Sequence, residues 1–332
     1  MQRTPTSFDR RSLLKSLGTA AAAASVAGCL GADPGSDLRT TPAAAEFDAV
    51  ADTAWLEDNL GSVALLDVRD AEAYTDGHLP GAHRLPDTEL LRDHYEETDD
   101  GYEATPEIIA DIAAAAGIER SDDVVVYGEG SNLWETYAIY TLEAIGHEGT
   151  VSLLDGGYNA WTAADGAVET GVPDADPTTY EPELDTDVVA TRARVADTVD
   201  GDGATIQLVD NRRPAEYHGT EMDDRVSRHG HIPGAINVNF PQNLLDGERL
   251  RSPDQLETLW FDEAGFDPDA ETISYCTTAV RGSVGWFVMT QLGFETVRNY
   301  EGSWYDWGTL TAADGYPYVS GADTGRVVDT FA

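Results

Sequence analysis

The chain carries one ordered set of sequence marks twice, at positions roughly 145 residues apart. Each copy begins with an apolar run that ends in Asp-x-Arg, at Asp67 and again at Asp210. Each continues through an acidic-aromatic step to Gly-His-x-Pro-Gly-Ala, first at residues 77–82 and then at 230–235. A further apolar run and an acidic-Gly mark followed by Trp complete both copies. A repeat of this length is about one domain long, so the sequence predicts two tandem domains of one design.

Strand-like apolar runs alternate with helical stretches in both copies. The expected helices lie at residues 106–116, 134–145, 253–264 and 283–292. Such alternation is typical of α/β domains, each with a mainly parallel sheet flanked by helices. The predicted parts of the chain are a leader at 1–28, a linker at 29–45, a first domain at 46–172, a linker at 173–190, a second domain at 191–320 and a tail at 321–332.

The second copy holds the one thiol that would stay free if the signal-like N-terminus consumes the thiol of Cys29. The two cysteines of the chain are Cys29 and Cys276. Cys276 follows the β-prone run 272–275 and precedes an apolar stretch that begins with small residues. A lone thiol at a strand-to-helix turn is poorly placed for a disulfide and well placed for nucleophilic chemistry. The backbone N–H groups of the turn and the N-terminus of the following helix would stabilise a thiolate there.

Together these marks resemble the rhodanese family, specifically its tandem two-domain sulfurtransferases, from Phe47 to Gly308. The resemblance implies that Cys276 takes a sulfane sulfur from thiosulfate or a related donor, holds it as a persulfide and passes it to a thiophilic acceptor such as cyanide. The active-site loop so implied is Thr277, Thr278, Ala279, Val280 and Arg281, supported by the ion pair of Asp210 and Arg212. The sequence shows no metal-ligand cluster, Gly-rich nucleotide loop or flavin signature, so neither a metal nor a cofactor is expected.

The loop departs from the well-known subgroups, which leaves the donor open. Thiosulfate-type members carry basic residues just after the Cys, and 3-mercaptopyruvate-type members carry Gly-Ser/Thr-Gly, whereas this chain has Cys-Thr-Thr-Ala-Val-Arg. Glu216 stands about where two-domain members often place an Arg for the donor anion, which weakens the case for a strongly anionic pocket. Arg225 or Arg228 could substitute, although surface positions are the plainer interpretation. His78 and His231, repeated within Pro-Gly turns, are interpreted as structural.

The first copy lacks the parts needed for this chemistry. It has Gly128 where the second copy has Cys276, lacks the closing Arg, and carries Glu129 where an anion would sit. We therefore expect the first domain to be inert. Because ligand sites often lie between domains, we expect it to pack against the second domain and to form a wall of the cleft.

Three other functions compete with thiosulfate sulfurtransferase. One is 3-mercaptopyruvate sulfurtransferase, and another is a persulfide carrier or sulfur sensor that docks on a redox or thiol partner protein. The third is a phosphatase, whose loop also runs from Cys to Arg. Phosphatase loops have five residues between Cys and Arg, but only four separate Cys276 from Arg281. The loop length therefore disfavours the phosphatase.

The N-terminus resembles a twin-arginine export signal. Arg10 and Arg11 precede a short Ala-rich apolar run that is too brief to span a bilayer and that ends in a lipobox-like Val-Ala-Gly before Cys29. The expectation is export by the twin-arginine route and lipidation of Cys29, which would anchor the protein at the extracytoplasmic face of the cell membrane.

The charge of the chain is strongly one-sided. It has 61 acidic and 20 basic residues, a formal net charge of −41, and its one lysine is Lys15 in the leader. Such a surface repels itself at low ionic strength, as in halophilic proteins, and it repels nucleic-acid phosphates. Nucleic acid is therefore excluded as a partner.

Overall fold

The computed structural model describes residues 47–85, 95–98, 101–104, 106–171, 173, 175–200, 206–221, 223–310, 314–322 and 324–331. The expected leader, the linker 29–45 and the lipidation site Cys29 lie outside these residues. Within the described part, no helix is long and apolar enough to cross a membrane.

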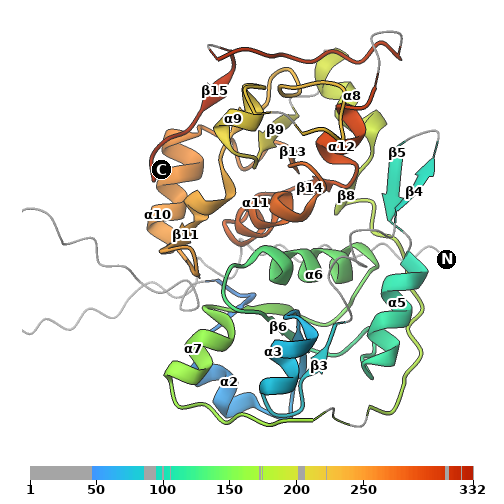
Figure 1. Ribbon diagram of the computed structural model, residues 1–332, viewed down its shortest axis with the longest axis vertical. Coiled ribbons are helices and arrows are strands. Elements are labelled where there is room, and N and C mark those ends of the chain that lie inside the picture. The colour runs from blue at the N-terminus through green and yellow to red at the C-terminus, as the bar shows by residue number, and fades with distance from the viewer. Residues whose placement is uncertain are drawn as a thin grey trace, which may run out of the picture. The chain divides into compact units, whose positions relative to one another are not determined.

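The first domain is built on a five-stranded, wholly parallel sheet with the order β1-β7-β6-β2-β3. All four residues of the central strand β6 are buried, as expected for a strand covered on both faces. The strands are β1 (Val50–Ala51), β2 (Ala64–Asp67), β3 (His83–Arg84), β6 (Val124–Tyr127) and β7 (Val151–Leu154). The helices are α2 (Thr53–Asn59), α3 (Ala71–Asp76), α5 (Pro106–Ala115), α6 (Leu133–Ala144) and α7 (Gly157–Ala163), and β4 (Tyr95–Thr98) and β5 (Gly101–Ala104) form an antiparallel pair (Figure 1).

The second domain contains a six-stranded parallel sheet with the order β15-β10-β9-β13-β14-β8. Its strands are β8 (Val189–Ala190), β9 (Gln207–Asp210), β10 (Ile236–Asn237), β13 (Thr272–Tyr275), β14 (Val297–Tyr300) and β15 (Arg326–Val327). Its helices are α8 (Arg192–Asp200), α9 (Pro214–Tyr217), η2 (Phe240–Asn243), α10 (Pro253–Glu257), η3 (Thr258–Glu263), α11 (Val280–Gln291) and α12 (Ser303–Trp307), and β11 (Leu244–Leu245) pairs antiparallel with β12 (Arg249–Leu250).

The two sheets share one strand order, which confirms the predicted α/β fold and its duplication. Read in chain order, both domains arrange their first five sheet strands as 1-5-4-2-3, and the second domain adds β15 at its edge. Two expected helices differ in detail. The helix expected at 283–292 begins earlier, at Val280, and the one expected at 253–264 passes from α10 into the π-helical segment η3.

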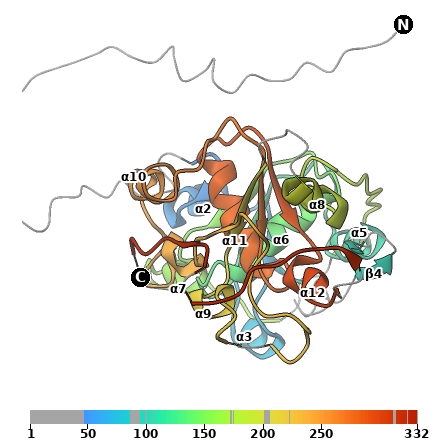
Figure 2. The same ribbon diagram turned by 90° about the horizontal axis from the view of Figure 1, so that it is seen from above.

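The two domains meet through the helices that follow their corresponding loops. Helix α6 lies against α11, and the hydroxyls of Thr136 and Ser283 are 2.9 Å apart across that contact (Figures 1 and 2). The ring of Tyr140 packs edge-on against Trp286, with centroids 5.3 Å apart. One apolar cluster includes residues of both helices and of both sheets, so the contact between the domains is part of the core.

A carboxyl group is buried at this joint. Glu301, just after β14, is 2 % exposed, accepts a hydrogen bond from the Tyr140 hydroxyl, and has no partner for its Oε2 atom in the described part of the chain. Burial raises the pKa of Glu301 to about 7, and the hydrogen bond from Tyr140 only partly opposes that rise. Between the usual pKa of 4.5 and this raised value, Glu301 is therefore mostly protonated in the folded protein and mostly ionised in the unfolded chain.

We predict that Glu301→Gln stabilises the protein at pH 8 relative to the wild type. Because the pKa is raised on folding from 4.5 to about 7, the contribution of Glu301 to stability is complete below pH 4.5 and is lost as the pH rises to about 7. A shift of this size corresponds to about 3 kcal/mol. Denaturant unfolding of both proteins at pH 5 and pH 8 measures the difference, with Glu129→Gln as the exposed control. A wild-type-minus-variant difference that is the same at both pH values would contradict the prediction.

Candidate active site

The candidate site lies where the chain order of the second sheet reverses. Strands β9 and β13 are neighbours, but the chain leaves β9 toward β10 on one side and leaves β13 toward β14 on the other. The carboxyl ends of such a strand pair are the usual ligand position in open α/β sheets. Cys276 follows β13 directly, and Arg212 and Glu216 follow β9. The sheet therefore brings together residues that are more than sixty positions apart in the sequence.

Cys276 is 1 % exposed and is a free thiol. Its loop is fixed through the backbone: the Cys276 carbonyl accepts the N–H of Trp304 at 3.0 Å, and the Thr277 carbonyl accepts that of Tyr305 at 2.9 Å. No acceptor within the described ranges takes the backbone N–H of Thr277 or Thr278. These groups and the N-terminus of α11 are available to a sulfur anion on Cys276.

The Ser303 hydroxyl binds the backbone of the Cys276 loop. This hydroxyl accepts the backbone N–H of Cys276 at 3.3 Å and that of Ala279 at 2.9 Å, and it donates to the carbonyl of Tyr300 at 2.7 Å. The residue is fully buried and has φ +49°, a left-handed conformation that is uncommon for a residue with a side chain. Its counterpart in the first domain is Gly157, with φ +54°.

Ser303 is a residue of the site that the sequence motifs do not include. The signal available was the difference between Asp-Gly-Gly at 155–157 and Glu-Gly-Ser at 301–303. A serine at a position where the other copy has glycine indicates that its hydroxyl makes a contact specific to the second domain.

The guanidinium of Arg281 is paired with a carboxylate and is not a free cation at the site. Arg281 lies in the first turn of α11, and its two terminal nitrogens donate to the two carboxylate oxygens of Glu216 at 2.7 and 2.9 Å. One of these nitrogens also donates to the Thr277 hydroxyl at 2.6 Å. Burial raises the pKa of Glu216, but the hydrogen bonds and charge of Arg281 and Arg213 outweigh burial and lower it to about 2. Glu216 is therefore ionised throughout the physiological range.

The rest of the predicted loop divides into buried and accessible parts. Ala279 is fully buried with φ +63°, Val280 is 8 % exposed, and both belong to the apolar cluster shared by the two domains. Their contribution to a ligand is thus limited to the backbone. Thr277 is buried against Arg281, while Thr278 is half-buried.

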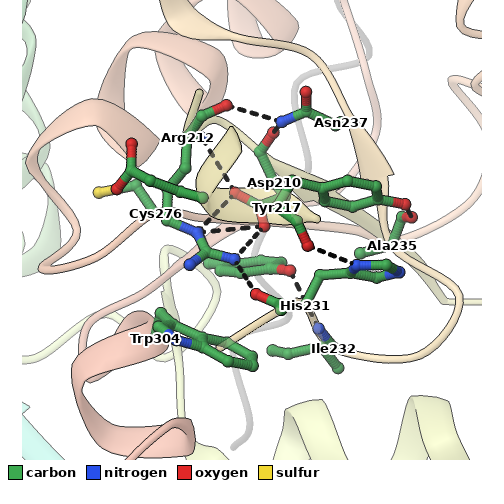
Figure 3. Close-up of polar contacts among 12 residues, drawn as sticks. Asp210, Arg212, Tyr217, His231, Ile232, Ala235, Asn237, Cys276 and Trp304 are labelled. Carbon is green, nitrogen blue, oxygen red and sulfur yellow. Dashed lines mark hydrogen bonds and ion pairs between the residues drawn. The ribbon is translucent and has the colours of Figure 1, made fainter. Parts of the chain in front are cut away.

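Asp210 and Arg212 form a buried scaffold (Figure 3). Arg212 Nη2 lies 2.6 Å from the Asp210 carboxylate and 2.6 Å from the carbonyl of Gly230, and the guanidinium stacks over Trp304. The Sγ of Cys276 points away from this pair. Asp67 and Arg69 repeat the arrangement in the first domain, so the pair belongs to the fold and not to the second site alone.

The repeated histidines occupy equivalent structural positions. His231 Nδ1 is 2.8 Å from the carbonyl of Tyr217, and the two rings stack 3.7 Å apart. His78 makes the same contacts with Tyr74 at 2.9 and 4.0 Å. Burial lowers the pKa of His231, which keeps the ring neutral.

Neither additional arginine that was considered for the donor is free. Arg225 pairs with Asp223 at 2.6 Å, and the buried Arg228 donates to the carbonyl of Tyr316 at 2.7 Å. No group of three or more potential metal ligands occurs among the described residues.

In the first domain, the carboxylate of Glu135 fills the loop that begins at Gly128, the counterpart of the Cys276 loop. Glu135, on the first turn of α6, is 1 % exposed, and backbone N–H groups of Glu135, Gly130, Asn132 and Trp134 donate to its side chain. Burial raises the pKa of Glu135, and these N–H groups oppose the rise. A Cβ atom added at Gly128 would lie 2.3 Å from Glu135 Oε1. The expectation that Glu129 lies at the anion position is wrong: Glu129 is exposed, and Glu135 takes that position.

A segment of the second domain then covers the filled loop. The side chain of Asn132 donates to the carbonyl of Glu248 at 2.9 Å, and the N–H of Leu250 donates to Asp155 at 3.0 Å. Both contacts come from the β11–β12 hairpin. The loop that corresponds to the Cys276 loop is thus a joint between the domains.

Two parallel-sheet domains share one strand order, and one of them ends a central strand in a buried thiol beside backbone N–H groups that have no acceptor among the described residues. This combination is typical of a tandem rhodanese-type protein. The rhodanese-like domain family model matches residues 52–164 and 191–310, and the chain belongs to the rhodanese family.

Named relatives match over most of the chain. A thiosulfate sulfurtransferase of Corynebacterium glutamicum is 34% identical over 275 residues, covering 79% of this chain and 88% of the relative. The sulfur carrier protein TtuD of Thermus thermophilus is 32% identical over 291 residues, covering 83% and 98%. The crystal structure of SseA from Escherichia coli, a 3-mercaptopyruvate sulfotransferase, matches with a TM-score of 0.66 and 27% identity, covering 77% of this chain and 98% of that one.

We predict that Ser303→Ala and Ser303→Gly lose similar amounts of activity, about tenfold each, but differ in stability. Both variants leave the buried N–H groups of Cys276 and Ala279 without their acceptor. Only the alanine variant keeps the cost of a side chain at positive φ, about 1 kcal/mol, so it should melt at the lower temperature. Sulfur-transfer rates and melting curves test both points. Wild-type activity in the glycine variant would show that the hydroxyl does not hold the loop.

We also predict that Gly128→Cys creates no second active site. The new side chain meets Glu135 and Val68 Cγ2 at 2.9 Å, so the protein should melt at a lower temperature. In a Cys276→Ser background, the thiol introduced at position 128 should gain no sulfur from a donor, as measured by intact mass. Adding Glu135→Gly is the matched comparison, because it removes the carboxylate that fills the loop. Sulfur uptake by the Gly128→Cys protein with Glu135 intact would contradict this account.

Proposed function

We propose that this protein is a sulfurtransferase that moves a sulfane sulfur from a thiosulfate-type donor, through a persulfide on Cys276, to a thiophilic acceptor such as cyanide. The observation that carries the proposal is Cys276 itself, a free thiol at the end of a central strand. It is followed by the N-terminus of α11 and by the N–H groups of Thr277 and Thr278, for which the described residues offer no acceptor. The thiosulfate sulfurtransferase of Corynebacterium glutamicum and the E. coli SseA structure support the same chemistry.

The reaction has two balanced steps. In the first, the thiolate of Cys276 attacks the outer sulfur of thiosulfate, a new S–S bond forms, the S–S bond of the donor breaks, and sulfite leaves with the bonding electron pair. In the second, cyanide attacks the outer sulfur of the persulfide, thiocyanate leaves, and the Cys276 thiolate is restored. Both the thiolate and the persulfide are anions, so the same backbone N–H groups stabilise each of them.

A carrier role is the second candidate. The relative TtuD is a sulfur carrier protein, and it matches nearly its whole length to this chain. The chemistry at Cys276 would be unchanged, and the acceptor would be a thiol or redox partner protein instead of a small molecule. A 3-mercaptopyruvate donor is the third candidate, supported by the E. coli SseA structure.

The setting proposed for this activity is the extracytoplasmic face of the cell membrane. The twin-arginine-like Arg10 and Arg11 and the lipobox-like sequence before Cys29 support export and a lipid anchor. The net charge of −41 supports the proposal that the protein works at high salt concentration. Residue-specific mass analysis of the N-terminus of the protein purified from its membranes tests the anchor.

We predict that Cys276→Ser abolishes thiocyanate production while leaving the melting temperature within a few degrees of wild type, because the substitution replaces sulfur by oxygen at one buried position. Thiosulfate and 3-mercaptopyruvate are compared as donors in high salt, and thiocyanate is measured. Turnover that survives in the variant would contradict the mechanism. A persulfide on Cys276 in the wild type without thiocyanate formation would instead favour the carrier.

A further inference from the structure

The Arg281 guanidinium is occupied by a carboxylate of the protein. Glu216 presents both oxygens to the two terminal nitrogens of Arg281, at 2.7 and 2.9 Å. This paired geometry is the one that arginine offers to the oxygens of a carboxylate, a phosphate or a similar oxyanion. The Thr277 hydroxyl, next to Cys276, accepts a hydrogen bond from one of these two nitrogens. The Glu216–Arg281 pair therefore adjoins the Cys276 loop. An oxyanion group of a donor that used the same paired geometry, through both terminal nitrogens of Arg281, would have to displace Glu216.

A second arginine makes that displacement feasible. Arg213 donates to Glu216 from its side-chain Nε at 3.0 Å and from its backbone N–H at 3.2 Å. Glu216 is 12 % exposed, whereas Arg213 is 56 % exposed and lies toward solvent. If Arg281 turns to a donor, Glu216 keeps a partner in Arg213 and is not left as an unpaired charge.

The neighbouring cations offer no alternative for a donor. Arg212 is buried on Asp210, and Arg225 is paired with Asp223. Arg213 also pairs with Glu221 at 2.6 Å. Each of these arginines thus has a carboxylate partner, in a chain whose acidic residues outnumber its basic ones by 61 to 20. A dianion that approaches Cys276 meets cations that are already neutralised.

We propose that Glu216 is a specificity-determining residue that competes with the donor for Arg281. It selects against dianionic donors such as thiosulfate and favours sulfane-sulfur donors that carry a single negative charge, such as organic thiosulfonates. This inference rests on the proposed sulfurtransferase function. With a thiosulfonate, the Cys276 thiolate takes the outer sulfur, the S–S bond of the donor breaks, and a sulfinate leaves with the electron pair.

Glu216→Gln is the central test. The amide keeps the shape of the side chain but removes the charge that competes for Arg281. Thiocyanate production is measured at constant ionic strength with thiosulfate and with benzenethiosulfonate, because screening by salt also changes KM. We expect KM for thiosulfate to fall about tenfold, KM for benzenethiosulfonate to fall about threefold or less, and kcat to change little for either donor.

Two further variants separate this role from general electrostatics. Glu221→Gln removes an equal charge from the same network without touching Arg281, and both KM values should stay within about twofold of wild type. Arg213→Gln weakens the second hold on Glu216, so KM for thiosulfate should rise and not fall. The opposite signs of the Glu216 and Arg213 effects are the signature of competition for Arg281.

The outcomes separate the inference from the function on which it rests. Wild-type protein that neither turns over any donor nor forms a persulfide on Cys276 overturns the sulfurtransferase itself. Wild-type turnover with an unchanged ratio of the two KM values in Glu216→Gln overturns the inference alone. An equal loss of kcat with both donors, at unchanged KM, assigns Glu216 a purely structural role and also overturns it.

Discussion

A cluster of backbone N–H groups at the end of the central strand is the constraint on which both domains depend. Groups buried in this way need an acceptor, and the turn that produces them is set by the fold. The first domain supplies the carboxylate of Glu135 from within its own helix. The second domain ends its strand in Cys276, and the Ser303 hydroxyl accepts the N–H groups of Cys276 and Ala279. Within the described ranges, the N–H groups of Thr277 and Thr278 remain for a thiolate or persulfide. One backbone arrangement thus yields a sealed joint in one copy and a reactive centre in the other.

Most of the architecture could be predicted from the sequence because it depends on repeated local marks. The apolar runs that end in Asp-x-Arg become β2 and β9, and the buried pairs Asp67–Arg69 and Asp210–Arg212 repeat their contacts closely. Cys276 could be predicted as the nucleophile because it follows a strand-like run directly, and the structure places it after β13 as a free thiol. These features need only the order of residues along the chain.

The parts that could not be predicted depend on pairing across the sheet. Glu216 follows β9 and Arg281 lies in the helix after β13, so their contact is set by the neighbouring positions of those strands. Glu135 looked like an ordinary helix residue because nothing in its local sequence shows that its side chain turns back into the loop. Ser303 was hidden for a similar reason, since its hydroxyl bonds to a loop more than twenty positions earlier in the sequence.

The pairing of Glu216 with Arg281 also removes the destabilisation that an unpaired, mostly buried Arg281 would cause. An arginine mostly buried beside a reactive thiol would be costly without a partner, and in the resting protein the donor is absent. Glu216 supplies the missing charge, and Arg213 holds the same carboxylate from the solvent side. The stability of the site and its selectivity therefore have a single cause, because a donor gains from Arg281 only the binding free energy that remains after it has replaced Glu216. A strongly acidic protein can in this way keep a cation beside Cys276 without leaving that cation open to every anion.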